Sequence, residues 1–237
     1  MMKKTLILTL SVALCAVFGG CQPARVRSPE QLYAAAVRDA MTVEAEEVLP
    51  VVALTPESGM AEFDDQGRVL MLSWHRHPDR YPAGEAAVLS WGEVWTFTSE
   101  KILSWYDRSG GGGVTDWELR FEQLIGLPPE AGYTHFSAFR VDLGDLFRPA
   151  YVWDITRSDM TASFEETPPE DFKAWFDGNI VWSYFDSAYP WTRLGYTYDW
   201  SGEGEYGLSE FIIRAGAEVE VAFTLTTGEF LLWLAEN

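Results

Sequence analysis

Residues 217–226 read AEVEVAFTLT, a stretch in which apolar and polar side chains alternate. Ala217, Val219 and Val221 fall at every second position, with acidic residues between them. Because successive side chains of a strand point to opposite faces, this pattern predicts a strand with one buried and one wet face. One wet face is typical of antiparallel sheets. We therefore expect a C-terminal β-meander from Tyr206 onward.

Further strands are expected earlier in the chain. The run Val69–Trp74 is apolar on both faces, which predicts a central strand of the sheet. Shorter apolar or alternating runs predict additional strands at Val51–Leu54, Ala86–Thr98, Thr134–Val141 and Gly195–Trp200.

Helix start signals lie between these strands. Ser28-Pro29-Glu30-Gln31 combines an N-cap serine, a proline at the first helical position and a capping-box glutamine, and predicts a helix to about Glu47. Similar signals predict helices from Ser99, from the capping box Thr115–Glu118 and from Thr167–Glu170. Strands and helices do not alternate regularly. The expected fold is therefore α+β, one domain over residues 29–237, with a mixed or mainly antiparallel sheet and several packed helices.

The N-terminus has the features of an export signal. Lys3 and Lys4 precede an apolar run over Thr5–Phe18, which is too short to span a membrane and suits a signal peptide. Gly19-Gly20-Cys21 follows and is similar to the lipobox of bacterial lipoproteins, in which the cysteine is acylated. We expect a signal peptide over residues 1–20, lipidation at Cys21 and a short tether over residues 21–28. An ordinary secretory signal is the alternative.

These features place the protein in the cell envelope. The acyl chains would be its contact with the membrane, at the outer membrane or at the extracytoplasmic face of the inner membrane. The chain has only two cysteines, and Cys15 lies within the signal, so the exported domain has no thiol for a disulfide or a nucleophile.

Charge excludes one class of partner. The chain has 36 acidic and 17 basic residues, a formal net charge of −19, which opposes binding to nucleic acid. The sequence contains no Walker, Rossmann, EF-hand or serine-nucleophile motif, so we expect no cofactor.

Three groups of residues are candidates for chemistry. His75 and His77 would project to one face of a strand and are a weak candidate metal pair, and Asp79 could orient His75 for acid–base work. Exposed loop histidines are the simpler interpretation. Arg148 has a planar guanidinium that suits a carboxylate or phosphate ligand, although a structural ion pair at a turn is the simpler explanation.

The third group is the aromatic stretch YPWTRLGYTYDW at residues 189–200. Rings on one strand face stack against sugars, but tryptophans occur throughout the chain after Trp74, so most rings are expected in the core. Arg193 and Asp199 are the unusual residues, because a charge among buried-type aromatics needs a partner. They either pair with each other or bind a ligand.

Four motifs together resemble an uncharacterised group of bacterial proteins, some of which carry secretion signals. The motifs are QLIGLP at 123–128, DLFRP at 145–149, the stretch at 189–200 and GLSEFII at 207–213. The resemblance covers most of the exported chain and implies a single domain. It implies no activity, ligand or catalytic residue.

Two functions follow from these observations. We expect a lipid-anchored, non-catalytic domain that binds an envelope glycan or protein. The alternative is an envelope hydrolase acting on a glycan or peptide, with His75 and Asp79, or acidic groups near Arg148 and Asp199, as its machinery.

Overall fold

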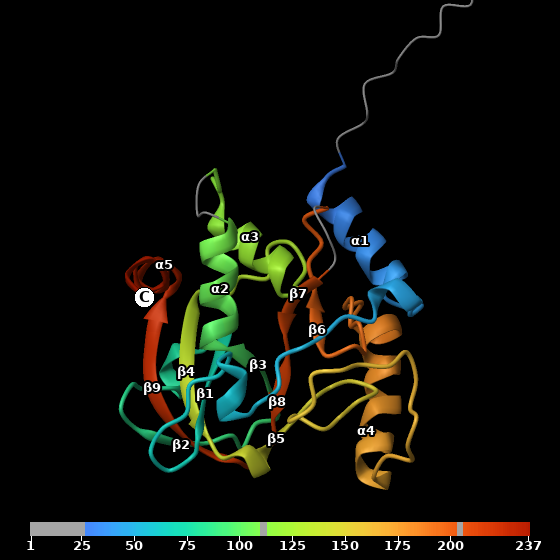
Figure 1. Ribbon diagram of the computed structural model, residues 1–237. Coiled ribbons are helices and arrows are strands. Elements are labelled where there is room, and N and C mark those ends of the chain that lie inside the picture. The colour runs from blue at the N-terminus through green and yellow to red at the C-terminus, as the bar shows by residue number, and fades with distance from the viewer. Residues whose placement is uncertain (1–26, 110–112, 203–205) are drawn as a thin grey trace, which may run out of the picture.

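The computed structural model describes residues 27–109, 113–202 and 206–237. The predicted signal peptide, Cys21 and most of the predicted tether lie outside the described residues. Figure 1 shows the elements. The helices are α1 (Pro29–Asp39), α2 (Ser99–Ser109), α3 (Trp117–Leu124), α4 (Glu170–Val181) and α5 (Thr227–Glu236).

Nine strands are described. They are β1 (Val69–His75), β2 (Ala86–Val88), β3 (Val94–Thr98), β4 (His135–Val141), β5 (Leu146–Phe147), β6 (Tyr196–Tyr198), β7 (Tyr206–Ser209), β8 (Phe211–Ile213) and β9 (Glu218–Thr226). Seven form one sheet in the order β2-β9-β4-β1-β3-β8-β5, and β6 pairs with β7 in a separate ribbon. Every pairing is antiparallel.

β1 is the middle strand of the large sheet, as its sequence predicted. All seven of its residues are buried, because β4 and β3 flank it and packed side chains cover both of its faces. Leu72 contributes to the core beneath α2, α3 and α5, together with Ile102, Phe121 and Phe230 from those three helices. Met71 points to the opposite core, which is closed mainly by loops.

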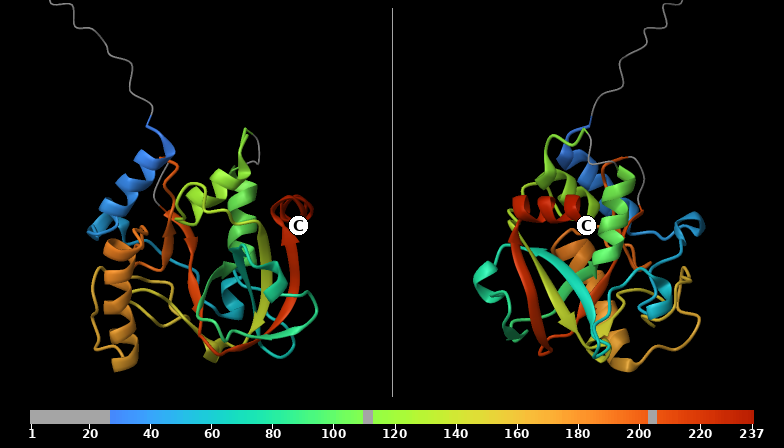
Figure 2. Two further views of the ribbon diagram at one scale, coloured as in Figure 1. Left: turned by 180° about the vertical axis from the view of Figure 1, so that it is seen from behind. Right: turned by 60° about the vertical axis from the view of Figure 1, so that its left-hand side comes forward.

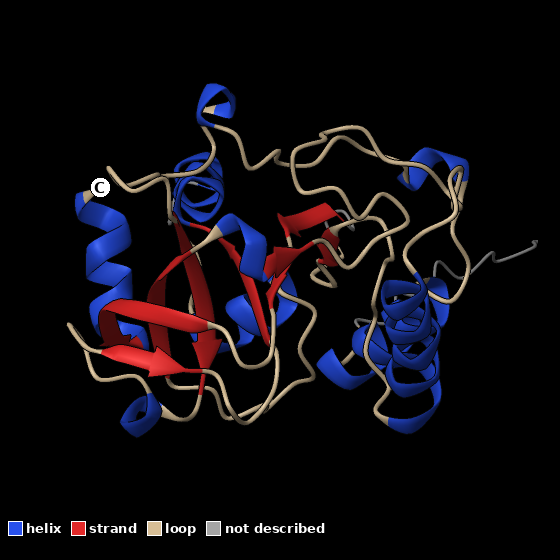
Figure 3. Ribbon diagram, turned by 90° about the horizontal axis from the view of Figure 1, so that it is seen from below, coloured by secondary structure: helices blue, strands red, loops and turns tan. Residues whose placement is uncertain are grey.

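The remaining helices stand at the other side of the sheet. α1 and α4 pack beside the β5 edge through a third core that includes Ala36, Phe172 and Phe176. Figure 2 shows these two helices on the side away from α5, and Figure 3 shows the strands between α5 and α4 from below. The molecule is a single α+β domain, as predicted.

Several local predictions need correction. α1 begins with the predicted Ser28 capping box but ends at Asp39, and only a short 3-10 turn, Ala45–Glu47, follows. α3 is capped by Asp116, whose side chain accepts the backbone N–H of Leu119, and not by Thr115. The extended segment Val51–Leu54 is not a strand, because its backbone bonds to loop carbonyls at positions 155 and 158.

The C-terminal region is rich in strands, but its order differs from a meander. β8 joins β3 to β5, and β9 joins β4 to β2, so consecutive strands here are not neighbours. The chain then ends in α5, which the sequence analysis missed. Thr226 and Glu229 form a full capping box at its start, and this signal follows directly on the strand β9.

Candidate functional site

A cavity of about 360 Å³ opens where the C-terminal end of β1 meets β3, β6 and the segment after α4. This volume is within the range of small-molecule sites, about 300–1,000 Å³. The walls come from parts of the chain far apart in sequence: β1 and β3 of the large sheet, β6 of the separate ribbon and the segment after α4. The cavity is therefore a product of the tertiary fold.

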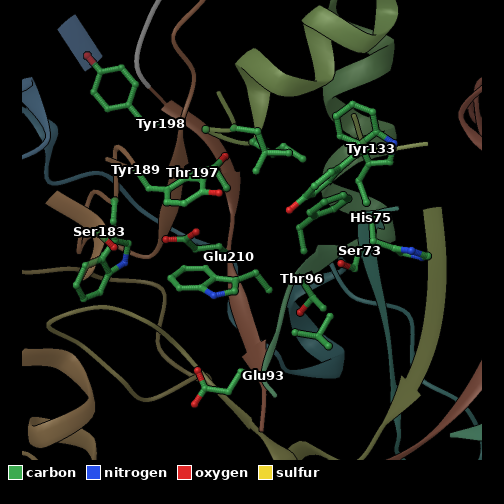
Figure 4. Close-up of a pocket in the computed structure, with 18 of the residues that line it drawn as sticks. Ser73, His75, Glu93, Thr96, Tyr133, Ser183, Tyr189, Thr197, Tyr198 and Glu210 are labelled. Atoms are coloured by element: carbon green, nitrogen blue, oxygen red, sulfur yellow. The ribbon is translucent and has the colours of Figure 1, made fainter. Parts of the chain in front are cut away.

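Aromatic side chains make up much of the wall. They are Trp74, Tyr81, Trp91, Trp95, Phe97, Tyr133, Trp182, Tyr189, Trp191 and Tyr198. Trp182 and Tyr189 stack on each other with ring centroids 5.2 Å apart. Figure 4 shows Tyr133 and Tyr189 extending into the space from opposite walls. Such a wall offers ring faces to a ligand from several directions.

Glu210 is the buried acid of this cavity. It lies between β7 and β8, and its backbone N–H donates to the carbonyl of Gly195 at 3.0 Å. Its side chain points into the cavity (Figure 4), and the residue is only 6% exposed. Its Oε1 has no hydrogen-bond partner among the described residues. Burial raises the pKa of Glu210 to about 8, so the carboxyl is held mainly in its neutral form at pH 7.

The chain gives Glu210 little freedom to leave this position. Its neighbours Ser209 and Phe211 are both fully buried and belong to the paired strands β7 and β8. A buried carboxyl without a partner costs free energy, and folded proteins rarely keep one without a role. Glu210 is therefore the strongest indication of a ligand site among the described residues.

His75 also lines the cavity, but its ring is held by other groups. The backbone N–H of His77 donates to Nδ1 of His75 at 3.1 Å. The Thr224 hydroxyl donates its proton to the carbonyl of Tyr81, so it must accept the hydrogen bond from the Ser137 hydroxyl. Because the proton of Ser137 is used in this way, Nε2 of His75 must donate to Ser137, at 2.8 Å. This order fixes the neutral tautomer, and burial lowers the pKa of His75 to about 4.

The structure places the other two residues of this candidate group differently. His77 is exposed and lies at the cavity wall with His75, whereas Asp79 is exposed and does not contribute to the wall. Arg80 lies at the wall with its guanidinium 4.9 Å from the Trp91 ring centroid. Within the described ranges, no three His, Cys, Asp or Glu side chains are grouped so that they could hold a metal ion.

Arg148 is completely buried away from the cavity wall. Its guanidinium donates to the backbone carbonyls of Arg157 at 2.8 Å, Val52 at 2.7 Å and Ile155 at 3.2 Å. Burial lowers the pKa of Arg148 to about 10. These hydrogen bonds join the loop at 155–157 to the extended segment at 51–54, which precedes a short 3-10 helix at Pro56–Ser58. The observed role of Arg148 is therefore to hold these two segments together.

Arg193 and Asp199 are both buried, but they do not pair with each other. Arg193 donates to the carbonyl of Ala40 at 2.8 Å and to the Tyr151 hydroxyl at 3.2 Å. Ala40 is the C-cap of α1, so the arginine places its positive charge at the negative end of that helix. Asp199 instead accepts two hydrogen bonds from Arg120, at 3.1 and 2.6 Å.

Among the described residues no helix is both long and apolar enough to span a bilayer. Comparisons with family models, curated proteins and solved structures found no match to this chain. The resemblance of the four motifs therefore stays a prediction.

Sequence reasoning singled out His75 and the stretch 189–200, and both contribute to the cavity wall. It did not single out Glu210. The available signal was the motif GLSEFII at 207–213, in which one acid interrupts an otherwise uncharged and mostly apolar run. A charge in such a run needs a partner or a ligand, the same argument that was applied to Arg193.

Proposed function

We propose that this protein is a lipid-anchored extracytoplasmic binding domain that takes a small ligand, free or part of an envelope component, into the aromatic cavity. Lipidation at Cys21 would hold the domain at the membrane surface, in the outer membrane or at the outer face of the inner membrane. No catalytic step is part of the proposal, because His75 is already engaged through both ring nitrogens and Asp79 lies outside the cavity.

One observation carries the proposal. The carboxyl of Glu210 is buried in an aromatic-lined cavity, and one of its oxygens has no partner among the described residues. Arg148 and Arg193 each leave Nε unpartnered as well, but their other guanidinium nitrogens donate within the protein, Asp199 pairs with Arg120, and none of the three lines the cavity. Convergence of aromatic rings on one unsatisfied polar group is the usual form of a small-molecule site.

The test compares two neighbouring aromatic residues. Trp182 lines the cavity and is 46% exposed, whereas Phe185 is 72% exposed, three residues further along the same π-helical turn (Trp182–Asp186), and does not line it. Binding of a panel of saccharides, short peptides and organic amines is measured by tryptophan fluorescence and calorimetry. We expect Trp182→Ala to weaken binding at least tenfold and Phe185→Ala to leave it unchanged. Equal effects of both variants, or no binding of any panel member, would contradict the proposed site.

The anchor is tested separately. Cells expressing the full chain should incorporate labelled palmitate into it, and Cys21→Ala should abolish the incorporation. Label that persists in the variant would refute lipidation at Cys21.

A further inference from the structure

The cavity also indicates which class of small molecule it takes. Its wall combines many ring faces with one buried acid, Glu210, whose Oε1 has no partner among the described residues, and two of its hydroxyls are used by the fold. Three separate observations on charge, on rings and on hydroxyls bear on the ligand.

The first observation concerns charge. Glu210 is the buried acid of the wall, and no described cation reaches its carboxyl. Burial lowers the pKa of His75 to about 4 and keeps its ring neutral, and Arg80 rests on the ring of Trp91. Glu93, the other acid of the wall, is exposed and accepts the indole N–H of Trp175 at 2.9 Å. A ligand with a positive charge would supply the counterion that Glu210 lacks.

The second observation concerns the rings. The face of an aromatic ring carries partial negative charge and attracts cations, and sites for quaternary ammonium groups use several rings around one centre. Tyr189 and Tyr133 approach the same space as the Glu210 carboxyl (Figure 4), and Trp182 lines the cavity and stacks on Tyr189. The chain's net charge of −19 also attracts cations to its surface.

The third observation concerns two hydroxyls of the wall. Thr96 donates to the carbonyl of Phe211 at 3.1 Å. Thr197 donates to the carbonyl of Leu124 at 2.7 Å and accepts the backbone N–H of Leu208 at 2.8 Å. These two hydroxyls are used by the fold and offer no free donor to a ligand, so the charge of Glu210 and the ring faces are the features on which the ligand class is argued.

We propose that the cavity binds a small organic cation of the alkylammonium class, with the Glu210 carboxylate as its counterion and the surrounding rings as its cage. This inference rests on the proposed function and gives its ligand a chemical class. Binding would replace the proton of the neutral Glu210 carboxyl by the ammonium group, and that proton would pass to solvent. Binding should therefore strengthen with pH as long as Glu210 is protonated in the free protein.

The experiment uses a matched pair of probes, choline and its uncharged isostere 3,3-dimethylbutan-1-ol, with the exported domain. We expect choline to bind at least about tenfold more tightly than the alcohol. Between pH 6 and pH 7 the Kd for choline should fall by close to tenfold, because the pKa of Glu210 is about 8, and the Kd for the alcohol should not change. Calorimetry in two buffers of different ionisation enthalpy should show release of close to one proton.

Variants assign the effect to Glu210. The other titratable groups of the wall are His75, His77, Arg80, Glu93, Tyr81, Tyr133, Tyr189 and Tyr198. Glu210→Gln should abolish the pH dependence and reduce the preference for choline to the part that the rings provide, with binding of the alcohol retained as the sign of an intact cavity. Glu218→Gln removes the same charge from the exposed face of β9 and should change neither.

The outcomes separate the two proposals. Equal affinity for choline and the alcohol, or a preference and a pH dependence that Glu210→Gln leaves unchanged, would overturn the cation inference while leaving the binding site. Binding of saccharides or peptides alone, weakened by Trp182→Ala, would also overturn it and would support the proposed function. Absence of binding by every probe would overturn both.

Discussion

The guanidinium of Arg120 donates to both carboxylate oxygens of Asp199, and so ties α3 to the end of β6. The two residues are 79 positions apart in the chain. Asp199 also accepts the backbone N–H of Ser201, and the Arg120 guanidinium lies 5.0 Å from the Trp105 ring centroid. The pair thus holds together α3 and β6, which border the cavity at Ile125, directly after α3, and at Tyr198 in β6.

Removing one member of this pair should be costly. Arg120→Met leaves Asp199 largely buried without its partner, and we expect a loss of about 3–5 kcal/mol in the free energy of unfolding, measured by urea denaturation. Asp177→Asn is the control, because Asp177 pairs with Lys173 on the exposed surface of α4 and should cost less than about 1 kcal/mol. Similar losses in both variants would mean that burial does not govern the strength of the pair.

Gly195 should tolerate no side chain. Its φ is +76°, and an added Cβ would lie 2.7 Å from Cδ of the buried Arg148. Gly216 has a similar φ of +83° but open space around it. We expect Gly216→Ala to cost about 1 kcal/mol from backbone strain alone and Gly195→Ala several kcal/mol more, measured by thermal unfolding. Equal costs would show that Arg148 moves aside freely.

His75 should make the fold weaken in acid. Its pKa is lowered from 6.5 to about 4, so between these values the unfolded chain binds a proton that the folded chain does not. The contribution of His75 to the free energy of unfolding is therefore fully present above pH 6.5 and is lost as pH falls. The loss reaches about 3 kcal/mol by pH 4. The difference in unfolding free energy between the wild type and His75→Gln should follow this curve. A difference that is constant with pH would contradict the assignment.

Glu210 should have the opposite effect on stability. Its pKa is raised from 4.5 to about 8, so between these values the folded chain keeps a proton that the unfolded chain has lost. Its contribution is full below pH 4.5 and is lost as pH rises to 8, by up to about 1.4 kcal/mol per pH unit. Glu210→Gln should abolish this slope and leave the ligand-free protein relatively more stable at pH 8. If the variant and the wild type have parallel profiles, Glu210 is ionised in the folded protein.

Local sequence was sufficient for much of the fold. The apolar run of β1, the alternation of β9 and the capping signals at Ser28 predicted their elements, because periodicity and helix capping depend on neighbouring residues. The α+β class followed from the order of these elements. The helix α5 was not predicted, because its capping box begins at Thr226, which is also the last residue of the alternating pattern of β9. The strand pattern was followed there and the helix start signal was overlooked.

The partners of buried charges were decided by the tertiary structure. Sequence alone showed that Arg193 and Asp199 lie among aromatics and need partners, and only the fold brought Ala40 to the arginine and Arg120 to the aspartate. Glu210 is a second case in which sequence was insufficient. Its motif shows an acid in a mostly apolar run, but sequence alone could not show that its Oε1 lacks a hydrogen-bond partner among the described residues. That depends on which side chains surround the carboxyl in the folded protein, and those side chains come from distant parts of the chain.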